Sequence, residues 1–134
     1  MGGVLVDLDM EGCKDAFKRL LGYYKIDELL DPWHQKGIIG RLEEGMITPE
    51  EFRAIVLSDS EPGSLPETVD QAMHYILKSI SPYKAEMLRR MSENYDIYML
   101  SNNNGITMVK ATEMFEEAGI PIDRIFRKCF LSYE

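Results

Sequence analysis

Ser101 and Asn102 are the residues of this sequence best suited, by type and position, to bind an anion. They end an apolar run, Tyr95–Leu100, that predicts a β-strand, and they precede a polar turn, Asn103-Asn104-Gly105. A serine hydroxyl and the backbone N–H groups that open a following helix form a common site for phosphate-like anions. A structural interpretation also fits, in which these polar residues only form a turn that caps the next helix.

Two aspartates near the start of the chain are a second candidate. Asp7 and Asp9 flank a single leucine in an extended stretch, Val4–Asp9, so their side chains would lie on one face of a strand. Such a pair can supply a nucleophile, here Asp7, and a general acid/base, here Asp9. In the alternative, both residues lie in a flap or at the start of a helix, and Asp9 caps that helix.

The remaining polar residues fit structural roles better than chemical ones. His34, beside Trp33, falls in a predicted helical region where it would be a substrate contact or, more commonly, a half-buried structural residue. The acidic pair Glu43-Glu44 fits a solvated helix face. The two cysteines, Cys13 and Cys129, are far apart, which predicts free thiols in a reducing cytoplasm. No metal site is predicted from spacing.

Composition narrows the function classes. The chain has 134 residues, 45% of them apolar, a formal net charge of −8 and a sequence pI near 4.8. A protein this acidic lacks the basic footprint that nucleic acids or anionic membranes require as main partners. Neither a bilayer-spanning run nor a signal peptide is predicted. A small phosphorylated metabolite remains compatible, because it needs only a local binding pocket.

Hydrophobic spacing and turn signals predict an α/β chain with a helical middle. Predicted helices span about 13–22, 26–30, 33–42, 49–56, 65–80, 82–94 and 105–118, and predicted strands span 2–9, 95–100 and 129–131. Two helix-capping boxes are predicted, at Thr48–Glu51 and Ser64–Glu67. The final strand–helix–strand succession predicts a parallel βαβ unit. We therefore predict a core made of residues 1–11 and 80–134, with an inserted helical cap made of residues 12–79.

Four segments, in this order, resemble parts of the haloacid-dehalogenase-like (HAD) hydrolases, in the branch of sugar-phosphate phosphatases and haloacid dehalogenases. Gly2–Asp9 resembles the stretch just after the nucleophile, and Glu43–Phe52 resembles a segment of the helical cap. Tyr98–Asn102 resembles the second motif, a hydrophobic strand that ends in Ser or Thr followed by Asn. Phe130–Glu134 resembles the strand that leads toward the third motif. Together they cover nearly the whole chain.

The resemblance implies a partial HAD-like Rossmannoid core with an all-helical cap. It also implies a phosphatase of a small phosphate ester, such as a sugar phosphate, which forms an aspartyl-phosphate with Mg²⁺. Ser101 and Asn102 would bind the phosphate. Two other functions stay open: a 2-haloacid dehalogenase, and a non-catalytic module that binds a ligand or partner.

The resemblance also has departures. In the favoured register, Met1 matches the residue after the nucleophilic Asp, and the Lys and metal-binding acid of the family would follow Glu134. We therefore expect a truncated and inactive chain that self-associates through an exposed core. In a second register, Val4–Asp9 itself resembles the first motif, although Met10-Glu11 departs from it.

Overall fold

The computed structural model describes residues 3–30 and 37–134, and it has the α/β fold expected from the sequence. In chain order, the elements are β1 (Val6–Leu8), α1 (Met10–Leu21), α2 (Ile26–Leu29), α3 (Gly37–Glu43), α4 (Pro49–Ser58), α5 (Pro66–His74), β2 (Leu77–Ile80), α6 (Pro82–Asn94), β3 (Ile97–Ser101), α7 (Gly105–Glu117), α8 (Ile122–Ile125) and β4 (Phe126–Leu131). His34 and the first part of the helix predicted at 33–42 lie outside the described residues. None of the described helices is both long and apolar enough to cross a membrane.

The predicted parallel βαβ unit is confirmed. β3 pairs with β4 in parallel, with Leu100 opposite Phe130 and Ser101 opposite Leu131, and α7 and α8 connect the two strands. β3 alternates between exposed and buried side chains, so that Met99 and Ser101 are buried while Leu100 is exposed. The register places Ser101 at the carboxyl end of the parallel pair, where ligands bind in open α/β sheets.

A second pair of strands was not predicted. The spacing of Ile76, Leu77 and Ile80 predicted a helix through residue 80, and this prediction is wrong. α5 ends at His74, and β2 pairs antiparallel with β1. Pairing with β1 gives β2 the backbone hydrogen bonds that a longer helix would have supplied, so a tertiary contact overrides the local helical pattern.

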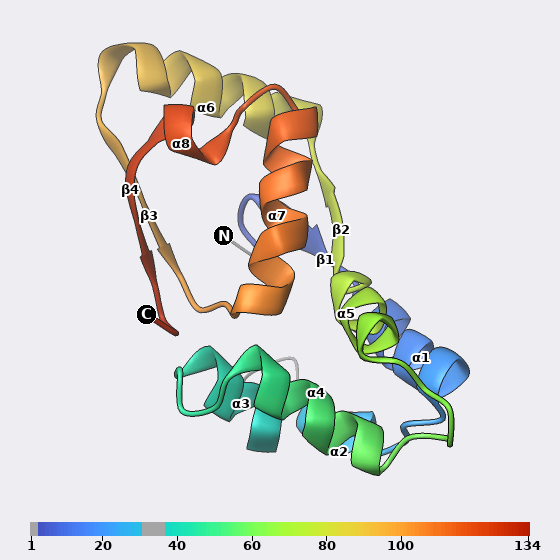
Figure 1. Ribbon diagram of the computed structural model, residues 1–134. Coiled ribbons are helices and arrows are strands. Elements are labelled where there is room, and N and C mark those ends of the chain that lie inside the picture. Colours follow the sequence, from blue (N-terminus) through green and yellow to red (C-terminus); the bar gives the residue numbers. More distant parts are fainter. Residues whose placement is uncertain (1–2, 31–36) are drawn as a thin grey trace.

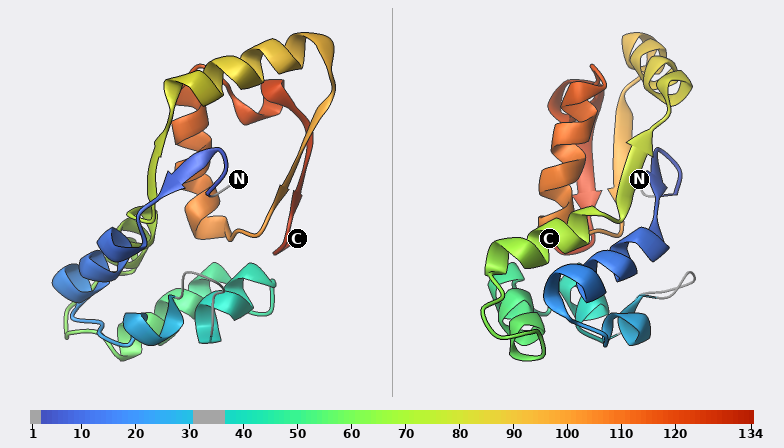
Figure 2. Two further views of the ribbon diagram at one scale, coloured as in Figure 1. Left: turned by 180° about the vertical axis from the view of Figure 1, so that it is seen from behind. Right: turned by 90° about the vertical axis from the view of Figure 1, so that its right-hand side faces the viewer.

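In the described part of the chain, helices α1 to α5 lie between β1 and β2 and form a layer apart from β3, β4, α6, α7 and α8 (Figures 1 and 2). Their buried apolar side chains include Phe17, Ile26, Phe52 and Val69. The division of the chain into cap and core at residues 12–79 stays a prediction. The strands β1 and β2 are the two places where the chain passes between the layers.

The two predicted capping boxes differ in outcome. The box at Thr48 is confirmed: its hydroxyl accepts from the Glu51 N–H at 3.1 Å, and the Glu51 carboxylate accepts from the Thr48 N–H at 3.3 Å. The box at Ser64 is wrong, because the Ser64 hydroxyl donates to the carbonyl oxygen of Glu61 at 2.7 Å. The helix α5 therefore begins after Leu65 with no side-chain cap.

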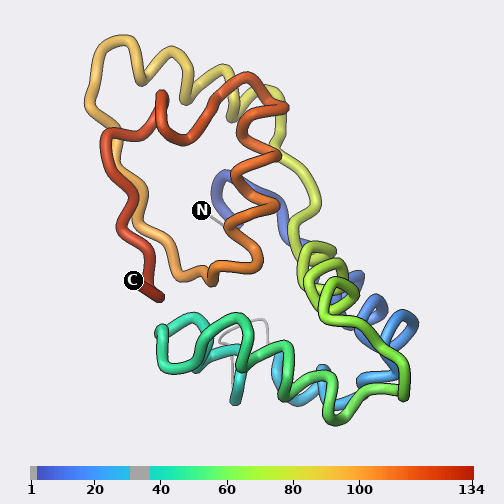
Figure 3. The backbone as a smooth tube through the Cα atoms, in the orientation of Figure 1, coloured from blue at the N-terminus to red at the C-terminus, as the bar shows by residue number. Residues whose placement is uncertain are grey.

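The helical layer approaches the other one closely at several places, two of which involve His74 and Gly45. The His74 Nε2 atom, at the end of α5, lies 2.9 Å from the carbonyl oxygen of Ile106 at the start of α7. Gly45, after α3, has a φ of +75°, and a Cβ there would lie 2.6 Å from the carbonyl oxygen of Tyr133. The end of β3 and the turn into α7 consequently face helices α3 and α4 (Figure 3).

Candidate functional site

Ser101 and Asn102 keep hydrogen-bond donors that no described residue uses. Ser101 is only 9% exposed, and its backbone carbonyl oxygen accepts from the Ser132 N–H at 3.0 Å. Within residues 3–30 and 37–134, the structure shows no partner for the Ser101 hydroxyl or for the Asn102 backbone N–H. A buried hydroxyl without a partner is uncommon in folded proteins. These two donors at a strand end are therefore available to an anion.

Asn103 and Asn104 have a different task, which is to cap α7. The Asn104 Oδ1 atom accepts from the N–H groups of Ile106 and Thr107, both at 3.0 Å. The Asn103 Oδ1 atom accepts from the Asn104 N–H at 2.9 Å and from the Thr107 hydroxyl. The capping interpretation is therefore confirmed for Asn103 and Asn104, whereas anion binding by Ser101 and Asn102 stays a prediction.

Ser132, after β4, fixes the position of this turn. Its hydroxyl accepts from the Asn103 N–H at 3.1 Å and lies 3.2 Å from the Asn103 carbonyl oxygen. Since β3 and β4 are already paired in register, the strand ends and the turn form one connected unit. Sequence reasoning missed Ser132, although its place just after a strand, beside a second strand end, was a usable signal.

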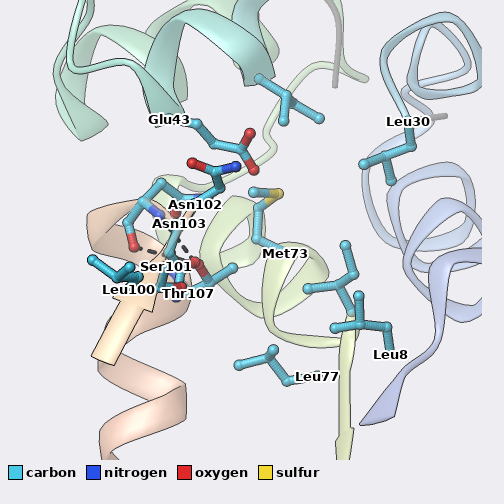
Figure 4. Close-up of a pocket in the computed structure, with 13 residues that line it drawn as sticks. Leu8, Leu30, Glu43, Met73, Leu77, Leu100, Ser101, Asn102, Asn103 and Thr107 are labelled. Carbon is cyan, nitrogen blue, oxygen red and sulfur yellow. Dashed lines mark hydrogen bonds between the residues drawn. The ribbon is translucent and has the colours of Figure 1, made fainter. Parts of the chain in front are cut away.

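A cavity of about 320 Å³ opens between this turn and the helical layer (Figure 4). One wall is polar and comes from the strand end and α7: Ser101, Asn102, Asn103, Asn104 and Thr107. The facing walls are mostly apolar and come from the helical layer and from the two-stranded pair: Leu8, Leu30, Ile39, Met73, Ile76 and Leu77. Apolar walls with a few convergent polar groups are typical of small-molecule sites.

Glu43 is the exception among the residues from the helical layer. Its side chain lines the cavity and points from α3 toward Asn102. Burial, reinforced by the charge of Glu44, raises the pKa of Glu43 from an ordinary value of 4.5 to about 7. The sequence-based interpretation of Glu43 as part of a solvated face is wrong. Its position four residues after the buried Ile39, on the same helix face, was the signal that could have identified it.

Asp7 and Asp9 both lie outside this cavity and have other partners. The Asp9 Oδ1 atom accepts from the Gly12 N–H at 2.9 Å, which confirms the interpretation of Asp9 as the cap of the first helix. The Asp7 carboxylate accepts from the Ser79 hydroxyl at 3.4 Å and lies 3.6 Å from Lys84 Nζ. The arrangement does not place either carboxylate near Ser101.

A magnesium site is not formed by the described residues alone. In those residues, no three His, Cys, Asp or Glu side chains gather as ligands. The donor set does not fit a Mg²⁺ ion, which binds to carboxylates and other oxygens in octahedral geometry. The structure therefore supports no reaction step through a metal that these residues hold.

Known proteins resemble this chain in sequence. A D-ribitol-5-phosphate phosphatase of Bacteroides thetaiotaomicron is 32% identical over 134 residues, which is 99% of this chain and 65% of the relative. The chain thus spans slightly less than two thirds of the length of that curated relative. No protein-family model matches the chain.

Solved structures resemble it in fold. A HAD family enzyme of Bacteroides thetaiotaomicron, an aspartate-to-alanine mutant in complex with magnesium and inorganic phosphate, matches with a TM-score of 0.90 at 33% identity, over 99% of this chain and 66% of the other. A predicted HAD-like family hydrolase of Porphyromonas gingivalis matches with a TM-score of 0.81 at 30% identity, over 98% and 63% of the two chains.

Proposed function

Since this chain belongs to the HAD-like hydrolase superfamily, we propose that Ser101 and Asn102 bind the phosphate group of a small phosphate ester, such as a sugar or polyol phosphate. In this proposal, the whole protein hydrolyses that ester. The observation that carries it is the pair of unused donors at the end of β3, in a turn that Asn104 and Ser132 hold in place. The named activity of the curated relative supports the substrate class.

The chemistry assigned to these residues is binding and orientation. The Ser101 hydroxyl and the Asn102 N–H donate to phosphate oxygens, and hydrogen bonds to a charged acceptor are the stronger ones. The cavity has no cationic side chain among its lining residues in the described part of the chain. We therefore expect weak phosphate affinity for these residues alone, on the order of 1 mM, which corresponds to about 4 kcal/mol.

Hydrolysis through an aspartyl-phosphate would need a carboxylate at the phosphorus atom, to form the new P–O bond while the alcohol leaves. Asp7 and Asp9 are not placed to supply it. We accordingly expect no magnesium-dependent hydrolysis of D-ribitol 5-phosphate by these 134 residues. Turnover that Asp7→Asn abolishes would support the second register, in which Asp7 is the nucleophile.

A dehalogenase and a non-catalytic binding module are the competing functions. The phosphatase named among the relatives favours a phosphate ester over a haloacid. The binding module would instead be favoured by one result in a protein that also includes the remaining third of the relatives' length. That result is saturable phosphate binding without turnover.

The proposal is tested by the affinity for inorganic phosphate, measured by calorimetry. Ser101→Ala removes the hydroxyl at the strand end, and we expect a loss of affinity of about tenfold to a hundredfold, which corresponds to the ~1.5–3 kcal/mol of one hydrogen bond to a charged group. Ser58→Ala is the matched control, because Ser58 is exposed on α4 and its hydroxyl donates only to the Ile55 carbonyl oxygen. Equal affinity in Ser101→Ala and the wild type would refute the assignment.

We further propose a cytoplasmic location and self-association through the exposed face of the β3–β4 pair. The thiols of Cys13 and Cys129 are free, as in proteins of reducing compartments. Tyr98, Leu100 and Phe130 are exposed, and the rings of Tyr98 and Phe130 lie 6.5 Å apart.

A further inference from the structure

We propose that Glu43 selects the substrate of this site, because its carboxylate accepts hydrogen bonds from hydroxyl groups in the organic part of the ester and repels esters that carry a second anionic group. This inference rests on the proposed function, since it presupposes a phosphate at Ser101 and Asn102. It assigns a binding role to a helix residue whose sequence context indicates only solvation.

The geometry places Glu43 opposite the phosphate-binding donors. α3 covers the cavity from the helical layer, and in Figure 4 the Glu43 side chain points across it toward Asn102. The other described residues that line the cavity are apolar or carry amides and hydroxyls, so that Glu43 is the one ionisable side chain among them. A ligand that fills the cavity from the strand end therefore meets Glu43 on the wall that faces Asn102.

The negative charge of Glu43 determines the orientation of the ester in the cavity. A phosphate dianion beside a half-buried carboxylate would be strongly repelled, because both charges lie in a region of reduced dielectric. The phosphate is accordingly bound at Ser101, and the organic group faces Glu43. Leu30, Ile39 and Met73 can contact its carbon atoms. A second carboxylate or phosphate on the organic group would meet the same repulsion from Glu43.

Glu43 also lacks a protein partner within the described residues. Among the described residues, burial and the charge of Glu44 raise its pKa, and none donates a hydrogen bond to its carboxylate. A half-buried charged group without a partner destabilises the fold, because its hydration is lost without compensation. Hydroxyl donors from a polyol would supply the missing hydrogen bonds. A hydrogen bond to a charged group contributes more than one between neutral groups.

The ionised groups near α3 do not offer an alternative partner. Among the described residues, the titratable groups on α3 and on the segments packed against it are Arg41, Glu44, Asp27, Glu28, Glu50, Glu51, Arg53, Tyr133 and Glu134. Asp27 pairs with Lys18, and Arg53 pairs with Asp70. Within residues 3–30 and 37–134, acids predominate here and no ion pair joins Glu43 to Arg41 or Arg53.

The inference is tested by the ligand preference of Glu43→Gln at pH 8, where the wild-type carboxylate is ionised. Dissociation constants are measured by calorimetry for inorganic phosphate, D-ribitol 5-phosphate and 2-phosphoglycolate. We expect Glu43→Gln to bind ribitol phosphate about fivefold to tenfold more weakly than the wild type, while its affinity for inorganic phosphate is unchanged or higher. Its affinity for phosphoglycolate, which carries a carboxylate, should rise.

Glu28→Gln is the matched control, because Glu28 is an exposed acid on the neighbouring helix α2 and does not line the cavity. Thermal melts confirm that both variants fold. For each protein, the affinity for ribitol phosphate is divided by the affinity for inorganic phosphate. If this ratio is the same for Glu43→Gln and the wild type, the inference is overturned. If the wild type binds inorganic phosphate and Ser101→Ala weakens it, that result leaves the proposed function standing. If the wild type binds no phosphate at all, both fall together.

A second readout separates binding from packing. The advantage of wild type over Glu43→Gln for ribitol phosphate should disappear as the pH falls from 8 to 5.5, since Glu43 takes up a proton in this range. An advantage that is equal at both pH values would indicate that the substitution acts only through the structure of α3, and would contradict the inference.

Discussion

At the scale of single residues, the polar turn after β3 contains two pairs with different hydrogen bonding. The side chains of Asn103 and Asn104 accept from groups at the start of α7, whereas the Ser101 hydroxyl and the Asn102 N–H have no partner among the described residues. This separation has a direct consequence for stability, because the two groups of residues respond differently to substitution.

Asn104→Ala should lower the free energy of unfolding by about 1–2 kcal/mol, since it leaves the N–H groups of Ile106 and Thr107 without their acceptor. Urea denaturation measures the change. Asn94→Ala is the control, because Asn94 is exposed at the end of α6, and we expect a change within about 0.5 kcal/mol. Equal effects in the two variants would contradict the capping role.

Glu43 makes the stability depend on pH in a defined direction. Its pKa of about 7 in the folded protein exceeds the ordinary 4.5, so between these values the folded protein holds a proton that the unfolded chain has released. The contribution of Glu43 to stability therefore falls as the pH rises from 4.5 to 7 and is constant above 7.

Glu43→Gln removes this dependence. Its Tm should equal or fall below that of the wild type at pH 4, and its Tm relative to the wild type should increase up to pH 8. Melts at pH 4, 6 and 8 measure this, with Glu28→Gln as the comparison. A Tm difference that does not change with pH would show that Glu43 is not desolvated.

At the scale of helices and strands, local signals predicted the elements that local interactions build. The Thr48 capping box and the apolar run that became β3 were both recognisable, because their stabilising contacts lie within a few residues. β2 was not predicted, because its pairing partner β1 is about 70 residues away in the chain. Ser64 was mistaken for a cap, because its hydroxyl had a competing acceptor in the preceding turn.

The contact between α5 and α7 is the element-level feature with the clearest consequence for the site. His74→Ala removes the hydrogen bond to the Ile106 carbonyl oxygen, and we expect a loss of about 1–2 kcal/mol in stability. Amide hydrogen exchange should accelerate most in the first turn of α7, next to Ser101 and Asn102. Gln71→Ala, an exposed change on the same helix, is the control. Acceleration spread evenly over the chain would contradict a local role.

At the scale of the whole molecule, the site combines segments that are far apart in sequence. Ser101, Ser132 and Glu43 come from three different parts of the chain, and only the fold brings the first two together and places the third across the cavity. The strand end could be predicted, because one motif carries it. The composition of the opposite wall could not, because it depends on how the helical layer lies against β3.

The exposed face of the β3–β4 pair predicts how the molecule behaves in solution. Leu100 is 76% exposed, Tyr98 52% and Phe130 46%, on adjacent paired strands. An apolar patch on a two-stranded sheet favours association with a second copy. We expect the weight-average mass in analytical ultracentrifugation to rise with concentration between about 10 μM and about 1 mM.

Tyr98→Glu should suppress this rise, because it introduces a charge into the patch. Tyr83→Glu is the matched control, since Tyr83 is also exposed but lies at the start of α6. Association through this face would be contradicted if the weight-average mass of the wild type stayed at the monomer value at all concentrations. It would also be contradicted if the two substitutions had equal effects.

The most direct test of the account is the backbone amide spectrum of the isotope-labelled protein during titration with inorganic phosphate. If the strand end of β3 binds the anion, the Asn102 amide proton shifts downfield in a saturable manner and shows the largest change in the spectrum. The opposite result is a titration that leaves Asn102 unmoved while the largest shifts fall around Lys78 and Lys110, which line a separate surface pocket. That result would place the anion elsewhere and contradict the central claim.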